Sequence, residues 1–286
     1  NATSPLRPEI REAMLDVMEG AHNPSSTHAE GRAAKKILED ARGVIAETLR
    51  APKEGVVFTS GGTEAVNMAL HGAVQGPAKI RRLMVSAIEH DAVKASAGAQ
   101  KKHGIEIEMI PVTRDGIIDL AFVEDRLREY DPQKDGAFLL CSMLANNETG
   151  VIQPVEKLGP LVWPKGGYLF VDAVQGFGKL DVNFGQCGAD LMAVGAHKVG
   201  GPVGVGALLM KPGLALSPLL LGGWQELSRR AGTENLAAIA GFAKVAEIVQ
   251  PGDYALLAAI RDRIEAGLSE DVIIWGKQSK RLPNTS

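Results

Sequence analysis

Lys198 lies among small residues in the stretch AVGAHKVGGP (193–202). Most lysines are solvated surface charges, but small neighbours leave a long cation little to lie against and let the backbone approach a ligand. Lys198 also ends a stretch, 189–198, that is typical of a buried strand. An amine that loses solvation has a lowered pKa and forms Schiff bases with aldehydes. Lys198 is therefore a candidate for covalent chemistry.

Asp172 follows the apolar run GYLFV (167–171), so its carboxylate is expected at the end of a buried strand. Taken alone, a helix cap or a salt bridge would explain this residue. Beside a Schiff-base lysine, the same carboxylate suggests a specific role in binding a cofactor. Pyridoxal 5′-phosphate (PLP) needs a carboxylate at its pyridine nitrogen, which keeps the ring protonated and an effective electron sink. The two residues together predict a PLP site.

The stretch TSGGTEA (59–65) supplies a possible phosphate site, because Gly61, Gly62 and Thr63 fall where a strand turns into a helix. Backbone amides and the helix dipole bind phosphate at such a place. The signal is weak alone, since many strand–helix turns are rich in glycine. The dinucleotide fingerprint is not matched at this turn, and PVGVGAL (202–208) precedes a strand rather than a helix.

His90 has several interpretations: a metal ligand, a base, a ring stacked on a cofactor, or a satisfied polar residue at a strand end. The chain has six histidines, but no two have a convincing zinc spacing with a third ligand, so we predict no metal. The serine-hydrolase pattern GxSxG is absent. A flat ring over a flat cofactor agrees best with the neighbouring residues.

The elements that must position these residues alternate along the chain. Helical spacing and short apolar runs predict helices at 8–20, 28–50, 61–75, 91–103 and 120–130, and strands, some with polar ends, at 55–60, 81–90, 105–112, 137–150, 167–178, 189–198 and 205–211. This alternation predicts an α/β fold with a mostly parallel central sheet and flanking helices. Ligands of such sheets bind outside the carboxyl ends of the strands, where the polar residues of this chain are expected to converge.

The segment PGDY (251–254) is the best boundary candidate, followed by a predicted helix at 256–269 and a predicted strand at 272–275. We therefore expect a large cofactor-binding domain over residues 1–250 and the start of a smaller C-terminal domain over 251–286. The chain begins at NATSP without a methionine and stops at RLPNTS. We expect further residues at each end.

The composition excludes several classes of protein. The 286 residues are 45% hydrophobic with a net charge of −3, and no basic stripe suggests nucleic-acid binding. The longest strongly apolar stretch, 137–145, is far too short to cross a membrane. Two cysteines suit a reducing compartment, so we expect a cytoplasmic protein.

Nine stretches of the chain together resemble the NifS/IscS-like cysteine desulfurases, PLP enzymes of the class V aminotransferase group. In the order of that family they are NATSP (1–5), NPSSTHAEGR (23–32), VVFTSGGTEAVNMAL (56–70), SAIEHDAV (86–93), ANNETGVIQP (145–154), VDAVQGFGK (171–179), AHKVGGPVGVGAL (196–208), RRAGTEN (229–235) and RLPNT (281–285). The resemblance implies the PLP-dependent transferase type I fold, with a smaller C-terminal domain, and a homodimer.

The resemblance also implies roles at the ring of PLP. Lys198 would hold the cofactor as a Schiff base and later move protons on the substrate. Asp172 would pair with the pyridine nitrogen, and Gln175 and Asn147 would hydrogen-bond near the ring hydroxyl. His90 would stack on the ring and act as an acid or base.

At the phosphate, the resemblance implies binding by the Gly62 amide, Thr63 and His197. Thr233 would reach the phosphate of the other subunit, which makes the site dimer-dependent. The family commonly has a serine where this chain has Gly195. Losing a hydrogen bond to a charged group costs about 1.5–3 kcal/mol, so we expect looser PLP binding, or a water in place of the hydroxyl.

The implied reaction converts L-cysteine to L-alanine and leaves the sulfur as an enzyme persulfide, for delivery to a sulfur acceptor or an iron–sulfur scaffold protein. The family's sulfur-accepting cysteine and substrate-carboxylate arginine are expected beyond residue 286. Cys141 and Cys187 are interpreted as structural, since a reactive cysteine is exposed and low in pKa. The alternatives are another class V PLP enzyme, such as a cysteine or cystine lyase or an aminotransferase, and a catalytically disabled interaction protein.

Overall fold

The computed structural model describes residues 2–20, 23–269 and 271–286. Asn1 of the NATSP stretch, and residues 21, 22 and 270 of the predicted domains, lie outside the described residues. Within the described ranges the strands are β1 (Val56–Thr59), β2 (Ile80–Ser86), β3 (Glu106–Ile110), β4 (Ala137–Met143), β5 (Tyr168–Asp172), β6 (Leu191–Gly195) and β7 (Gly206–Met210). The α-helices are α1 (Pro8–Met18), α2 (Ala29–Thr48), α3 (Gly62–Gln75), α4 (Asp91–Ala99), α5 (Leu120–Arg128), α6 (Pro132–Asp135), α7 (Gly159–Val162), α8 (Gln225–Ser228), α9 (Leu236–Ile248) and α10 (Ala255–Ala266).

The strands form one sheet in the order β1-β7-β6-β5-β4-β2-β3. Neighbours from β6 through β5, β4 and β2 to β3 are parallel, whereas β7 runs antiparallel to both β1 and β6. The prediction of a mostly parallel α/β sheet is thus confirmed. Because β7 reverses direction between them, β1 and β6 point the same way.

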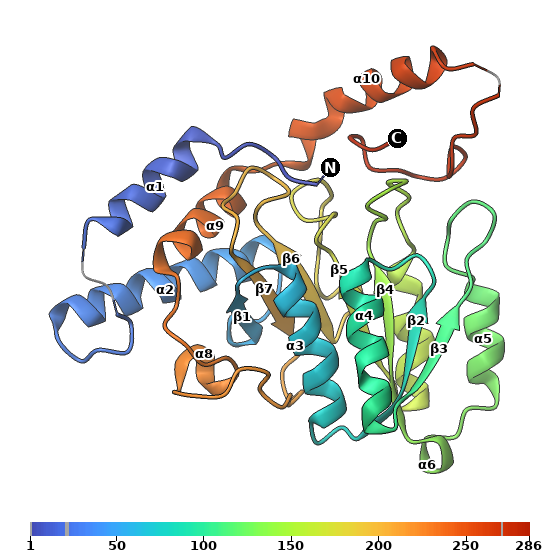
Figure 1. Cartoon of the computed structure of the whole chain (residues 1–286), viewed down its shortest axis with the longest axis horizontal. Helices are drawn as coiled ribbons and strands as arrows, with labels where there is room; N and C mark the ends of the chain where they lie inside the picture. Colours follow the sequence, from blue (N-terminus) through green and yellow to red (C-terminus); the bar gives the residue numbers. More distant parts are fainter. Residues whose placement is uncertain (1, 21–22, 270) are drawn as a thin grey trace.

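Helices cover both faces of the sheet (Figure 1). Side chains alternate between the faces of a strand, so Leu83 and Val85 of β2 pack with α3 and α4, while Met84 packs in the opposite core with residues of α2 and α9. Both cores are apolar, β6 and β7 are buried throughout, and β4 and β5 are buried from their second residue onward. Among the residues that the structure describes, no helix has the length and apolar character needed to cross a bilayer.

The predicted strand at 272–275 is wrong. These residues form no regular element, and Ile273 and Trp275 are 73% and 63% exposed. A strand needs a neighbour to complete its backbone hydrogen bonds, and no described strand pairs with this segment. The following residues pair instead with the loop after β4: the Ile152 amide donates to the Lys280 carbonyl at 2.9 Å and the Leu282 amide to the Gly150 carbonyl at 2.8 Å.

The predicted helix at 91–103 is shorter than expected. α4 ends at Ala99, and a 3₁₀ turn over Gln100–His103 leads to Gly104 at φ 75°. That left-handed conformation suits glycine and ends the helical run. Figure 1 shows α10 and the C-terminal segment lying beyond the sheet edge at which the loops after β4 and β5 emerge. The domain division at residue 250 stays a prediction.

Candidate active site

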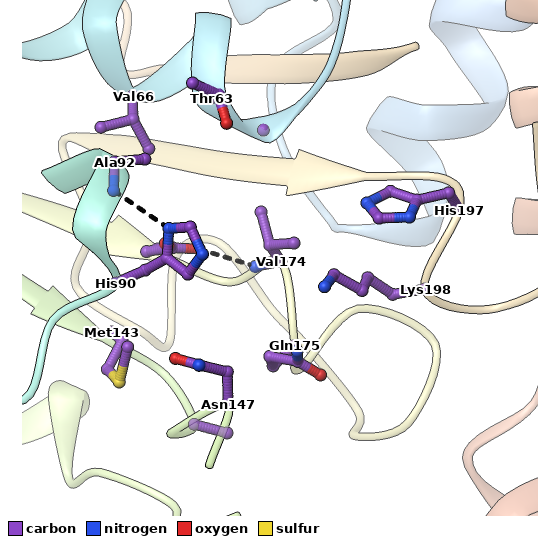
Figure 2. Close-up of a pocket in the computed structure, with 13 residues that line it drawn as sticks. Thr63, Val66, His90, Ala92, Met143, Asn147, Val174, Gln175, His197 and Lys198 are labelled. Carbon is purple, nitrogen blue, oxygen red and sulfur yellow. Dashed lines mark hydrogen bonds between the residues drawn. The ribbon is translucent and has the colours of Figure 1, made fainter. Parts of the chain in front are cut away.

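A cavity of about 230 Å³ lies at the carboxyl edge of the sheet. Every predicted site residue except Thr233 lines it: Gly62, Thr63, His90, Asn147, Asp172, Gln175, His197 and Lys198. These residues follow β1, β2, β4, β5 and β6, which all end at this edge. In Figure 2, Lys198 extends toward the middle of the cavity, with His90 on the opposite side and Asn147 below. Residues as far apart in the sequence as Gly62 and Lys198 therefore share one site.

Asp172 lines the cavity and is only 7% exposed. Its Oδ1 accepts a hydrogen bond from the Val174 amide at 3.0 Å. Burial raises the pKa of Asp172, while the Val174 amide and the proximity of His90 and Lys198 oppose the rise. A buried carboxylate of this kind is stabilised most by a cation placed beside it. The site is therefore suited to a ligand that carries positive charge at that point.

Lys198 is partly buried, and burial lowers the pKa of its amine against the opposing attraction of Asp172 and Glu148. The loop that carries Lys198 is held from the other end of the chain. The Ser4 amide donates to the His197 carbonyl and the Ser4 hydroxyl to the Lys198 carbonyl, both at 2.9 Å. The N-terminal segment thus positions the lysine, a role that the sequence did not reveal.

The N-terminus of α3 borders the cavity at Gly62 and Thr63. No side chain caps this helix, so its first amides are available to an anion. A Cβ at Gly62 would lie 2.6 Å from Val174 Cγ2, which explains why this position needs glycine. His197 lines the same cavity, and burial, then the positive charges of Lys198 and Lys179, lowers the pKa of its ring.

His90 caps α4, because its Nδ1 accepts a hydrogen bond from the Ala92 amide at 3.0 Å (Figure 2). Nδ1 is therefore the acceptor, and the neutral ring carries its proton on Nε2. His90 therefore caps α4 and lines the cavity at the same time. The capping bond fixes the direction of the ring.

Glu89 is a buried residue of the site region that sequence reasoning missed. Its buried Oε1 accepts a hydrogen bond at 2.6 Å from the amide of Met143, a residue that lines the cavity. Burial, and then the nearby charge of Asp172, raises the pKa of Glu89 well above its usual range. The sequence signal for Glu89 was its place beside His90, at the polar end of the strand predicted over 81–90.

Asn146 and Asn147 have different roles, and the cavity position of Asn147 agrees with its predicted place near the cofactor. Asn146 Oδ1 accepts hydrogen bonds from the Glu148 and Thr149 amides, both at 2.9 Å, and so shapes the turn. Asn147 lines the cavity, and its Nδ2 donates to Glu148 Oε1 at 2.6 Å.

Thr233 lies outside this cavity. It lines a separate cavity of about 150 Å³ with Ser60 and Arg230, and its side chain is exposed. Arg230 binds Glu64 in the first turn of α3 at 2.8 and 3.2 Å. The loop with Thr233 is therefore tied to the helix whose N-terminus borders the candidate site.

The chain is similar to known proteins over almost its whole length. The model of the family "Aminotransferase class-V" matches residues 1–272. "Cysteine desulfurase IscS 1" of Archaeoglobus fulgidus is 39% identical, over 99% of this chain and 74% of that protein. The chain belongs to the cysteine desulfurase family. The resemblance found in the nine sequence stretches is thus confirmed, and with it the class V group.

Solved structures similar to this chain have the same fold. A NifS-like protein from Rickettsia africae matches with a TM-score of 0.88 and 31% identity, over 99% of this chain and 78% of that one. A structure titled "SspA in complex with cysteine" matches with a TM-score of 0.83 and 31% identity, over 93% of this chain and 76% of that one. The type I PLP-transferase architecture expected from the sequence is confirmed.

Proposed function

We propose that this protein is a PLP-dependent enzyme that converts L-cysteine to L-alanine and passes the sulfur on as a persulfide. The observation that carries the proposal is the cavity that Lys198 and the buried Asp172 both line, within a chain of the cysteine desulfurase family. A relative of known structure has been seen with cysteine bound, which supports cysteine as the substrate.

The residues present fit PLP at both ends of the cofactor. The uncapped N-terminus of α3 at Gly62, with Thr63 and His197, would hold the phosphate. At the other end Asp172 would pair with the ring nitrogen, because its buried carboxylate is stabilised by a cation. Because Gly62 has no side chain, the turn before α3 can pack next to Val174 without a clash.

When bound, PLP supplies the electron sink for breaking bonds at the substrate's α-carbon. Lys198 would hold the cofactor through its aldehyde and then carry protons to and from the substrate carbons. Asn147 and Gln175 would hydrogen-bond near the ring hydroxyl, and His90 would stack on the ring and act as an acid through Nε2. Residues that orient a reactant in this way lower the entropic part of the barrier.

The sulfur step balances with one enzyme thiol. The substrate's C–S bond breaks, a sulfur–sulfur bond forms to the thiol, and the products are alanine and the persulfide. Cys141 and Cys187 are both buried, and burial raises the pKa of Cys141 well above its usual range and that of Cys187 to about 11. Neither suits a nucleophile that must be an exposed thiolate. The accepting cysteine and the substrate-carboxylate arginine stay predicted beyond residue 286.

Alanine formation from L-cysteine tests the proposal, using the full-length protein with added PLP and a reductant. Equal amounts of alanine and sulfide are expected. Pyruvate and ammonia in place of alanine would indicate a lyase, and transfer of the amino group to a keto acid would indicate an aminotransferase. Bound PLP without any product would favour a disabled relative.

Gly195→Ser is expected to tighten PLP binding about 10-fold, because a hydroxyl bonded to a charged phosphate contributes on the order of 1.5–3 kcal/mol. The site has room: a Cβ at Gly195 would lie 3.7 Å from Val174 Cγ1 and 3.8 Å from the Gly62 nitrogen, both ordinary contacts. Titration of the apo-protein with PLP measures the change. Gly98→Ser, on the open surface of α4, is the matched control. Weaker binding by the Gly195 variant alone would contradict the phosphate assignment.

We also propose a homodimer with a shared site. The segment before Thr233 exposes large apolar side chains, since Leu221 is 84%, Trp224 87% and Leu227 55% exposed. Exposed apolar patches of this kind mark association surfaces. A sulfur acceptor, such as an iron–sulfur scaffold protein, is the further partner that we propose. The cytoplasm stays the predicted location.

Thr233→Ala is expected to weaken PLP binding about 10-fold, through loss of a hydrogen bond to the phosphate held by the other subunit. PLP titration measures this, with Thr113→Ala as the control on an exposed loop. Mixed dimers locate the effect. Thr233→Ala subunits paired with Lys198→Ala subunits should regain one normal site, which combines an intact Lys198 with the partner's Thr233. No recovery in the mixed dimers would show that Thr233 does not act across the interface.

A further inference from the structure

Lys179 is a buried lysine outside the residues that line the candidate site. It lies in the turn after β5, and its residue is only 3% exposed. Its Nζ donates a hydrogen bond to Gln175 Oε1 at 2.8 Å. Gln175 does line the cavity and is itself 6% exposed. The turn therefore places a buried ammonium directly behind a side chain of the site.

Burying this ammonium is unfavourable. Desolvation, with the positive charge of Lys198 nearby, lowers the pKa of Lys179 to about 8. The amine is therefore still mostly charged at neutral pH. Buried lysines are rare unless they are paired, so the contact with Gln175 is the specific interaction that the structure offers to explain this residue.

The chemistry of the two groups determines which way the Gln175 amide faces. An ammonium has three donors and no acceptor, whereas an amide has an acceptor oxygen at one end and a donor NH₂ at the other. Lys179 can therefore bond only Oε1. With Oε1 turned toward Lys179, the amide offers donors, not an acceptor, at its other end.

We propose that Lys179 is a positioning residue that fixes Gln175 as a hydrogen-bond donor at the ring end of the cofactor site. The inference rests on the proposed function, because a donor is useful there for an oxygen acceptor such as the PLP ring hydroxyl. Charged Lys179 would also keep this donor in place when the substrate exchanges with Lys198.

The test measures PLP affinity of the apo-protein and the pH midpoint at which the absorbance of bound PLP changes. Lys179→Met should weaken PLP binding about 10-fold, the effect of losing one well-oriented bond, and should move the midpoint. Lys179→Arg, which keeps a donor-only cation, should restore both values toward wild type. Lys165→Met is the control, since Lys165 bonds the Arg128 and Tyr130 carbonyls outside the cavity.

Two further variants test whether Lys179 acts through Gln175. In a Gln175→Leu background, Lys179→Met should cause no further loss, because contacting residues that act as one unit are not additive. Gln175→Glu keeps an oxygen for Lys179 but offers an acceptor at the other end. It should weaken PLP binding at least as much as Lys179→Met does, and it keeps the test open should Lys179→Met fail to fold.

Wild-type affinity and midpoint in Lys179→Met would overturn the proposal. So would a full additional loss from Lys179→Met in the Gln175→Leu background, or normal PLP binding by Gln175→Glu. Failure of the wild-type protein to bind PLP at all would instead overturn the proposed function itself, so the two failures can be told apart.

Discussion

Replacing Lys198 with alanine is expected to abolish covalent attachment of PLP and to lower turnover by about 10³-fold or more. The variant loses both the amine that holds the cofactor and the group that moves protons, and proton transfer alone contributes about 10²–10⁴-fold. Absorbance of the purified protein and alanine formation measure the two effects. Lys94→Ala removes an exposed lysine paired with Asp91 on α4 and should change neither. A persistent absorbance band of covalent PLP in Lys198→Ala would assign the attachment to another lysine.

The lowered pKa of Lys198 makes the same assignment testable by pH. Burial disfavours the charged amine, so a larger fraction of Nζ is neutral and nucleophilic at neutral pH than in an exposed lysine. The rate at which apo-protein captures PLP should rise with pH, with a midpoint below the ordinary lysine value of about 10.4. A midpoint at or above that value would mean that burial does not activate this amine.

Asp172→Asn is expected to leave PLP covalently bound while lowering turnover about 10- to 100-fold. Asparagine has the same shape and can still accept from the Val174 amide, but it has no charge to balance a protonated ring nitrogen. A hydrogen bond to a charged group contributes about 1.5–3 kcal/mol, and each 1.36 kcal/mol corresponds to a factor of ten in rate. Alanine formation at saturating PLP measures the loss. Asp181→Asn, on an exposed ion pair with Arg50, is the control.

The thermal stability of Asp172→Asn shows whether its lower turnover comes from the lost charge or from misfolding. Burial raises the pKa of Asp172 in the folded protein, so its charged form opposes folding once the pH is above the carboxyl's ordinary value of about 3.9. Removing the charge should leave the apo-protein at least as stable at neutral pH, by thermal unfolding. Near-normal turnover in a stable Asp172→Asn variant would reject the role at the ring nitrogen.

The exposed face of α10 shows how a local sequence pattern differs from tertiary packing in what it can predict. Leu256 and Ile264 are 80% and 57% exposed, although the apolar spacing of the segment correctly predicted a helix. The spacing of side chains along one helix is a local property of the chain. What covers that helix depends on other segments, and the failed strand at 272–275 had the same cause, since its β-branched residues are suited to a strand that has no described partner.

The sequence by itself determined the alternation of strands and helices, the polar residues that end the strands, and the family. Each of these depends on residue types at short spacing, and apolar periodicity is sufficient to predict such elements. From Lys198 and Asp172 alone it also predicted a cofactor with an aldehyde and a ring nitrogen. Eight of the nine predicted site residues, all but Thr233, line one cavity.

Only the tertiary structure decided which polar residues meet and how. Strand order is set by backbone pairing between distant segments, and it brings the ends of β6, β5, β4 and β2 side by side. The same packing lets Asn146 shape the turn that presents Asn147 to the cavity. It also buries Lys179 against Gln175 and ties Ser4 to the Lys198 loop. These contacts join segments or turns whose geometry no local pattern encodes, because they form only when the sheet has brought their backbones together.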